Sequence, residues 1–171
     1  SEDEIREAVD TARAGGCSEL ALLTCVSSYP AMPSDYNLSR IVDMRERFQT
    51  VVGLSDHTLD NTCAIASITL GGCIIEKHFT LDRKGGGADD SFSLEPNDMK
   101  NLCESSLAAW QSIGSPEYGT KSTEKNNAQY RRSLYFVKSL KKGDVIKIDD
   151  IRSVRPGFGL PTKMFDSVVG S

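Results

Sequence analysis

Three short apolar segments alternate with helical patterns in the first two thirds of the chain, and this alternation restricts the possible folds more than any other feature. The segments are 20–26, 50–54 and 73–76, and each has the length and composition of a buried strand. Helical spacing of apolar residues precedes, separates and follows them. Strands that are separated by single helices form βα units on a parallel sheet. The sequence therefore predicts an α/β fold.

The predicted helices have recognisable ends. The first begins with a capping-box sequence at Ser1–Glu4 and stops at Gly15 and Gly16. The others are expected along Leu38–Arg45, Ala64–Ile68 and Pro96–Ile113. Three strands are too few to close a barrel, and the chain opens on a helix that has no strand before it. We therefore expect residues 1–114 to be the C-terminal βα units of an incomplete barrel.

The composition changes after this α/β part. Residues 115–128 are rich in Ser, Gly, Glu, Lys, Asn and Thr, which is typical of a linker. Residues 129–171 contain two predicted strands, 133–137 and 151–154, and a stretch rich in Gly and Pro. The sequence predicts a small β-rich domain at 129–171 that stops soon after it starts.

Charge and cysteine content exclude some classes of protein. A net charge of -4 argues against a nucleic-acid surface. No apolar run approaches the roughly 18 residues of a membrane span, and no signal peptide opens the chain. The five cysteines show no CxxC spacing, so a disulfide or zinc framework is not expected. We expect a cytoplasmic protein without nucleic-acid or membrane partners.

The two histidines of the chain, His57 and His78, each follow a predicted strand and have an acidic residue nearby, Asp56 and Glu76. Neighbouring strands lie about 5 Å apart, so the two imidazoles should share one pocket. Two imidazoles with a nearby carboxylate suit a divalent metal such as Mn²⁺, Fe²⁺ or Zn²⁺. The alternative is that each histidine is a hydrogen-bonded residue at a strand end.

Further polar residues occur where predicted strands give way to loops. Ser55 and the Ser27 loop could donate hydrogen bonds to a phosphate, or they could serve turns alone. Glu76 could hold a water molecule or a sugar hydroxyl, or it could pair with Lys77. Asp89 lies in a glycine-rich loop that could cover a substrate or be a solvated connector.

Four motifs follow one another along the chain: GLSDHT at 53–58, EKHFTLD at 76–82, RRSLY at 131–135 and RSVRPGFGL at 152–160. In this order they resemble the nonulosonic acid synthases, enzymes that condense phosphoenolpyruvate with an amino-sugar aldehyde. The loop DRKGGGADDSFSLEP at 82–96 resembles the pseudaminic branch of that family. The sialic branch tends to carry a PGPD-like sequence there, and often has Asn at the position of Ser27.

This resemblance implies a fold and an assembly. The chain would hold the C-terminal part of a TIM (β/α)8 barrel, followed by a partial antifreeze-like (SAF) domain. In the full-length protein, the SAF domain would reach over the active site of the partner subunit in a domain-swapped homodimer. The chain would lack the first five barrel strands and their substrate-binding lysines. We therefore predict no synthase activity for the chain alone.

The resemblance also implies roles for individual residues. His57 and His78 would be catalytic metal ligands for Mn²⁺ or Mg²⁺, and Glu76 would be catalytic on the water side. The implied substrate-binding residues are Ser55 and Ser27 for phosphate, Tyr29 and Asp89 for the sugar, and Arg155 for its acyl group, the last from the swapped domain.

The implied reaction is that of a pseudaminic acid synthase in nonulosonic acid biosynthesis for surface glycans. C3 of phosphoenolpyruvate would attack the aldehyde of 2,4-diacetamido-2,4,6-trideoxy-L-altrose. Water would add at C2, and phosphate would leave with C–O cleavage. The alternatives are a sialic or legionaminic acid synthase, a metal-dependent aldolase or hydrolase, and a non-catalytic carbohydrate-binding fragment.

Overall fold

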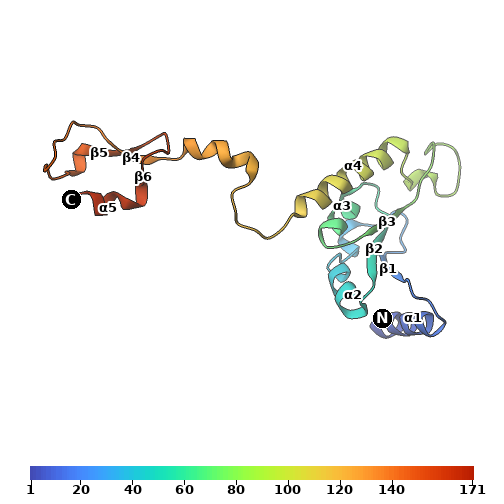
Figure 1. The fold of residues 1–171 in the computed structure, drawn as a ribbon. Coiled ribbons are helices and arrows are strands. Elements are labelled where there is room, and N and C mark those ends of the chain that lie inside the picture. Colours follow the sequence, from blue (N-terminus) through green and yellow to red (C-terminus); the bar gives the residue numbers. More distant parts are fainter. The chain divides into compact units, whose positions relative to one another are not determined.

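The computed structural model describes residues 1–127 and 129–171, and the chain divides into two compact units, Ser1–Ser115 and Pro116–Ser171. Each unit has a sheet of its own (Figure 1). Within the described residues, no helix combines the length and the apolar character that a bilayer crossing requires.

Unit 1 is built on a parallel three-stranded sheet, in the order β1 (Ala21–Cys25), β2 (Val51–Asp56) and β3 (Ile74–Lys77). The predicted α/β class is confirmed. The central strand β2 passes close to β3, since a Cβ atom added to Gly53 would collide with the carbonyl oxygen of Ile74. A side chain at position 53 would therefore force the two strands apart.

Four α-helices connect and flank these strands (Figure 1). They are α1 (Glu2–Ala14), α2 (Arg40–Phe48), α3 (Thr62–Thr69) and α4 (Pro96–Ile113). The predicted capping box is present at Ser1, whose side chain accepts a hydrogen bond from the backbone of Glu4. Short 3-10 helices span Pro33–Asp35 and Asp90–Phe92 in the loops after β1 and β3.

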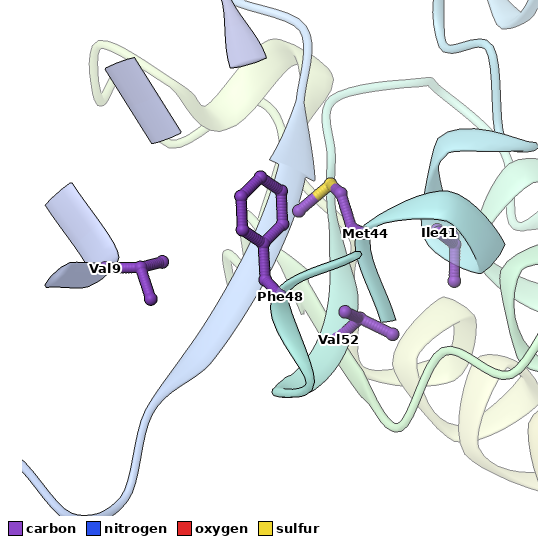
Figure 2. Close-up of a cluster of buried hydrophobic side chains, with 5 residues drawn as sticks. All are labelled: Val9, Ile41, Met44, Phe48 and Val52. Atoms are coloured by element: carbon purple, nitrogen blue, oxygen red, sulfur yellow. The ribbon is translucent and has the colours of Figure 1, made fainter. Parts of the chain in front are cut away.

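An apolar cluster fixes the first two helices to the sheet. Figure 2 shows its buried members, which come from α1, α2 and β2: Val9, Ile41, Met44, Phe48 and Val52. Burying side chains of this size stabilises a fold by about 1.5–3 kcal/mol each. The apolar stripe of α2 therefore accounts for its position beside β2.

Two smaller clusters hold the loops that follow the strands. Tyr36, in the loop after β1, is fully buried with Leu54 of β2. Leu94, at the end of the loop after β3, is buried against α3 and α4. The backbone amide of Leu94 also donates to the carbonyl of His78 at 2.9 Å. Both loops are thus packed onto the carboxyl-terminal side of the sheet.

Unit 2 has a small antiparallel sheet in the order β5 (Ile151–Val154), β4 (Ser133–Phe136) and β6 (Leu160–Pro161). The remaining elements are 3-10 helices at Ser122–Tyr130, Ile148–Asp150 and Thr162–Met164, and α5 (Phe165–Val168). The segment 115–128, which the sequence predicts to be a linker, includes most of the first 3-10 helix. Polar composition alone could not distinguish a short helix from an irregular connection.

Candidate active site at the carboxyl ends of the strands

The parallel register of β2 and β3 brings their last residues together in pairs. Ser55 lies opposite Glu76, and the Ser55 hydroxyl donates to the Glu76 carboxylate at 2.7 Å. Asp56 lies opposite Lys77, and their side chains form an ion pair of 2.9 Å. The Glu76–Lys77 pairing that the sequence left open is therefore wrong, because each residue pairs across the strands instead.

The two histidines follow directly after these pairs. The ring centroids of His57 and His78 are 5.2 Å apart, with the rings inclined at 68°. A shallow pocket of about 200 Å³ is lined by both histidines together with Ser55, Glu76 and Lys77. The prediction that His57 and His78 share one pocket with Glu76 is confirmed.

His57 is held in one ring orientation and one tautomer. Its Nδ1 atom lies 2.8 Å from the carbonyl oxygen of Val26. A carbonyl can only accept, so Nδ1 carries a proton, and in the neutral form of the ring the lone pair lies on Nε2. The backbone is anchored as well, because the His57 amide donates to the Tyr36 hydroxyl at 2.6 Å and its carbonyl accepts from Ala31 at 2.9 Å.

Tyr36 holds the backbone of His57 through its hydroxyl, and the sequence did not predict this role. Its side chain is fully buried, and burial is the main cause that raises the pKa of its hydroxyl to about 12. The phenol therefore stays neutral at physiological pH. A tyrosine in a polar loop gives no signal of this role, which becomes visible only when the loop after β1 packs under β2.

Replacing Tyr36 with phenylalanine is expected to lower the free energy of unfolding by about 1–3 kcal/mol. The His57 amide would lose its buried acceptor while the aromatic ring stayed in place. Urea denaturation would measure the loss. Tyr118→Phe is the matched control, because Tyr118 is fully exposed and its hydroxyl can be removed at little cost. Equal stability of the two variants would contradict the supporting role of Tyr36.

The ion pair between Asp56 and Lys77 is almost completely buried, with side-chain exposures of 0% and 2%. The Lys77 ammonium also donates to the carbonyl oxygens of Thr58 at 2.9 Å and Asp60 at 2.5 Å. The Asp56 carboxylate accepts from the amide of Thr58 at 2.9 Å. The polar groups of the pair are therefore satisfied within the loop that follows β2.

Aromatic and acidic side chains from two loops border the histidines. The Tyr29 ring lies 4.3 Å from the ring of His57 and 5.7 Å from that of His78. Phe92, which was not among the predicted site residues, lies 5.1 Å from the ring of His78. Asp89 is close to the same histidine, with 3.4 Å between its Oδ2 and Nδ1 of His78. The predicted site residues Tyr29 and Asp89 thus border the pocket.

Two predicted site residues lie elsewhere. Ser27 is exposed two residues beyond β1 and does not line the pocket. Arg155 is exposed in unit 2, next to Pro156, whose carbonyl accepts from the Tyr135 hydroxyl at 2.8 Å. The geometry of the pocket in unit 1 therefore involves neither residue.

The donor set fits a metal that takes two ligands from this chain. His57 offers Nε2 for coordination because Nδ1 is bound to a carbonyl, the arrangement typical of metal-bound imidazoles. His78 supplies a second imidazole in the same pocket. Among residues 1–127 and 129–171, no group of three or more His, Cys, Asp or Glu side chains is placed to hold a metal ion. Water or substrate would have to fill the remaining positions.

A larger hollow of about 540 Å³ lies at the opposite edge of the sheet. Its lining includes the first residue of each strand of the parallel sheet, Ala21, Val51 and Ile74, so it marks the amino-terminal edge of that sheet. Parallel α/β sheets place their chemistry at the carboxyl-terminal edge. The smaller pocket, which contains both histidines, is therefore the candidate active site.

The fold and the pocket define a parallel α/β protein whose polar site lies at the carboxyl ends of its strands. Comparison with known proteins identifies the family. The chain belongs to the NeuB family, which it matches over residues 1–118, and residues 131–171 match the SAF domain. The predicted membership among the nonulosonic acid synthases is confirmed, and so is the SAF domain.

Its relatives are named as synthases of more than one acid. A pseudaminic acid synthase from Campylobacter jejuni is 35% identical over 89% of this chain and 44% of its own length. An N,N'-diacetyllegionaminic acid synthase from Legionella pneumophila is 38% identical over 98% of this chain and 49% of its own length. The chain spans about half the length of the curated relatives that it matches.

A solved structure supports the same family fold. The crystal structure of N-acetylneuraminic acid (sialic acid) synthetase from Leptospira borgpetersenii, in complex with citrate, superposes with a TM-score of 0.67. It is 31% identical and aligns over 77% of this chain and 46% of that one. The described sheet has three strands, so a closed barrel stays a proposal for the whole protein.

Proposed function

We propose that this chain forms part of a nonulosonic acid synthase that condenses phosphoenolpyruvate with an amino-sugar aldehyde, and that the product is pseudaminic acid. The observation that carries the proposal is the pocket in which Ser55, Glu76, His57 and His78 meet. Synthases of this class match the chain over most of its length, which gives the pocket a chemical context.

In this proposal His57 and His78 hold a divalent cation, Mn²⁺ or Mg²⁺. When bound, such a cation supplies polarisation of the aldehyde carbonyl and so favours attack on its carbon. The hydrogen bond from Nδ1 of His57 to the Val26 carbonyl fixes the ring, so that Nε2 stays free to bind the cation. Pre-orientation of this kind lowers the cost of ordering the ligand.

Ser55 and Glu76 act on the phosphoenolpyruvate side of the proposed site. Glu76 holds the water that adds at C2, and the hydrogen bond from Ser55 keeps its carboxylate at the pocket until the substrate binds. The Ser55 hydroxyl is also a donor for the substrate phosphate once the substrate displaces Glu76 as its acceptor. Both groups lie at the end of rigid strands, which favours accurate positioning.

The proposed reaction balances without a redox partner. The C3 carbon of phosphoenolpyruvate forms a bond to the aldehyde carbon, whose oxygen takes up a proton. Water adds at C2, and the bond between C2 and the phosphate oxygen breaks. The products are a nonulosonic acid and inorganic phosphate.

The loop after β3 is the proposed determinant of the sugar. Its sequence at 82–96 resembles the pseudaminic branch. Asp89 and Phe92 from this loop border His78, where an amino sugar bound between the loop and Tyr29 would meet them. Legionaminic acid is the second candidate product, because the legionaminic acid synthase is the slightly more identical relative.

The proposal extends to the assembly. In a homodimer of the full-length protein, Arg155 of the SAF domain would bind the acyl group of the sugar in the active site of the partner subunit. Ser27 would contribute to the phosphate side of the barrel mouth, and the protein would work in the cytoplasm. The isolated chain is expected to lack synthase activity.

The test is phosphate release by the complete gene product with phosphoenolpyruvate and Mn²⁺. Three aldehydes are compared: 2,4-diacetamido-2,4,6-trideoxy-L-altrose, the aldehyde precursor of N,N'-diacetyllegionaminic acid, and N-acetylmannosamine. Release with the altrose alone would support the pseudaminic assignment. Preference for either of the others would reassign the sugar. Absence of release with all three, from a folded protein, would overturn the synthase proposal for these sugars.

A further inference from the structure

We infer that Lys77 is a positioning residue, whose ammonium group fixes the loop after β2 and thereby holds His57 opposite His78. The inference rests on the proposed function in so far as the two histidines bind a metal ion. Lys77 is not offered as a catalytic residue. Its side chain is 2% exposed, and its ammonium is occupied by acceptors of the protein itself.

The acceptors of Lys77 lie on both sides of His57 in the chain. The ammonium contacts the carboxylate of Asp56, immediately before His57, and the carbonyl oxygen of Thr58, immediately after it. A third contact, to the carbonyl oxygen of Asp60, reaches further into the same loop. One side chain thus fixes the backbone on either side of the histidine.

The strand that carries Lys77 also leads directly to the second histidine. Lys77 belongs to β3 and immediately precedes His78. Every bond from its ammonium therefore ties the strand of one histidine to the end of β2 or to the loop that carries the other. Tyr36 and Ala31 also form hydrogen bonds with His57. Both belong to the loop after β1, so these bonds do not connect His57 to the strand that precedes His78.

The location of the pair explains why it can set a distance. Buried charges whose hydrogen bonds are all satisfied are rigid, because any movement leaves a charge unpaired in a medium of low dielectric constant. Asp56 is held in turn by the amide and hydroxyl of Thr58, at 2.9 Å and 3.2 Å. The separation of 5.2 Å between the two imidazole rings is thus determined by a rigid polar group beside the pocket.

The test compares the complete protein with an Asp56→Asn, Lys77→Met variant, which removes both charges and leaves none unpaired. Lys77→Arg is a second variant, since it keeps the charge but cannot reproduce the compact ammonium geometry. Lys100→Met, Glu104→Gln is the matched control, because this lysine–glutamate pair is 72% and 66% exposed on α4. Melting temperature reports on folding for all four proteins.

Two readouts are specific to positioning. Affinity for Mn²⁺ alone, measured by electron paramagnetic resonance of the free ion, is expected to fall about 10–100-fold in the double variant, as for other groups that orient metal ligands. Nitrogen-15 spectra of labelled histidine rings are expected to show His57 as the Nδ1-protonated tautomer in the unaltered protein, and as a mixture in the variants. The His57 signal is assigned by its loss in His57→Asn.

The outcomes separate the inference from the proposed function. Weaker Mn²⁺ binding with a mixed His57 tautomer, in a folded variant, supports the positioning role. An unchanged tautomer signal overturns it, even if the melting temperature falls, because the pair would then be structural only. If the unaltered protein binds no Mn²⁺, the proposed metal site fails, and the tautomer signal still decides whether Lys77 positions His57. Should the double variant not fold, Lys77→Arg provides the same comparison.

Discussion

Asparagine at both position 57 and position 78 is expected to abolish Mn²⁺ binding and to slow phosphate release by at least about 100-fold. A metal that polarises a carbonyl contributes several kcal/mol to the transition state, and each 1.36 kcal/mol is a tenfold change in rate. Asparagine is the informative replacement for His57, because its amide can still donate to the Val26 carbonyl while it lacks the distal ring nitrogen. The loss then reports on coordination more than on folding.

The measurement is metal content after gel filtration, together with phosphate release from phosphoenolpyruvate and the best aldehyde of the three. Asn97→Ala, Asn101→Ala is the matched control, since both residues are exposed on α4 and only polar groups are truncated. The control is expected to keep its metal and its rate. Full activity of a folded His57→Asn, His78→Asn protein would show that neither histidine serves the reaction.

Much of this site could be predicted from the sequence because it depends on two strong regularities. Apolar segments such as 50–54 and 73–76 are recognisable as strands, and parallel strands bring their carboxyl ends to one edge. His57, His78, Ser55 and Glu76 follow from these regularities without any knowledge of side-chain packing. The second strand extends two residues further than expected, to Asp56, so that Ser55 lies inside the ladder and directly opposite Glu76.

The groups that support the site could not be predicted in the same way. Tyr36, Phe92 and the Val26 carbonyl come from loops, and their contacts with the histidines depend on how those loops fold back onto the sheet. No local pattern encodes such packing. Lys77 was visible as a charge beside Glu76, but its partner depends on the strand register, which pairs position 77 with position 56. The sequence could therefore offer Glu76 only as one alternative partner of Lys77, and the structure excludes that alternative.

The sequence favours one amino sugar by resemblance only, for a related physical reason. Selectivity between amino sugars depends on a few contacts from loops, and the loop at 79–95 is held by local bonds such as that from Arg83 to Asp98, at 2.6 Å. These bonds explain the conformation of the loop, but they do not indicate which sugar it binds. Similar identities to pseudaminic and legionaminic acid synthases, 35% and 38%, reflect the shared scaffold.

Methionine at position 77, with Asp56 left unchanged, is expected to lower the free energy of unfolding by about 3–5 kcal/mol. The Asp56 carboxylate, whose side chain is 0% exposed, would lose its counter-charge in a site that water does not reach. Thr58 would still donate to this carboxylate, but hydrogen bonds from neutral groups do not balance a buried charge. The measurement is the urea unfolding curve of the complete protein at neutral pH.

The same curve for Asp56→Asn, Lys77→Met distinguishes the two contributions of this pair. Replacing both partners of a buried ion pair is often close to neutral for stability, so the double variant is expected to lose less than the single one. Two variants of equal stability would mean that the carboxylate is not isolated from water. A stable double variant with weakened Mn²⁺ binding would instead show that the two charges are not required for stability. The charges would then be explained by the positions that they impose on His57 and His78.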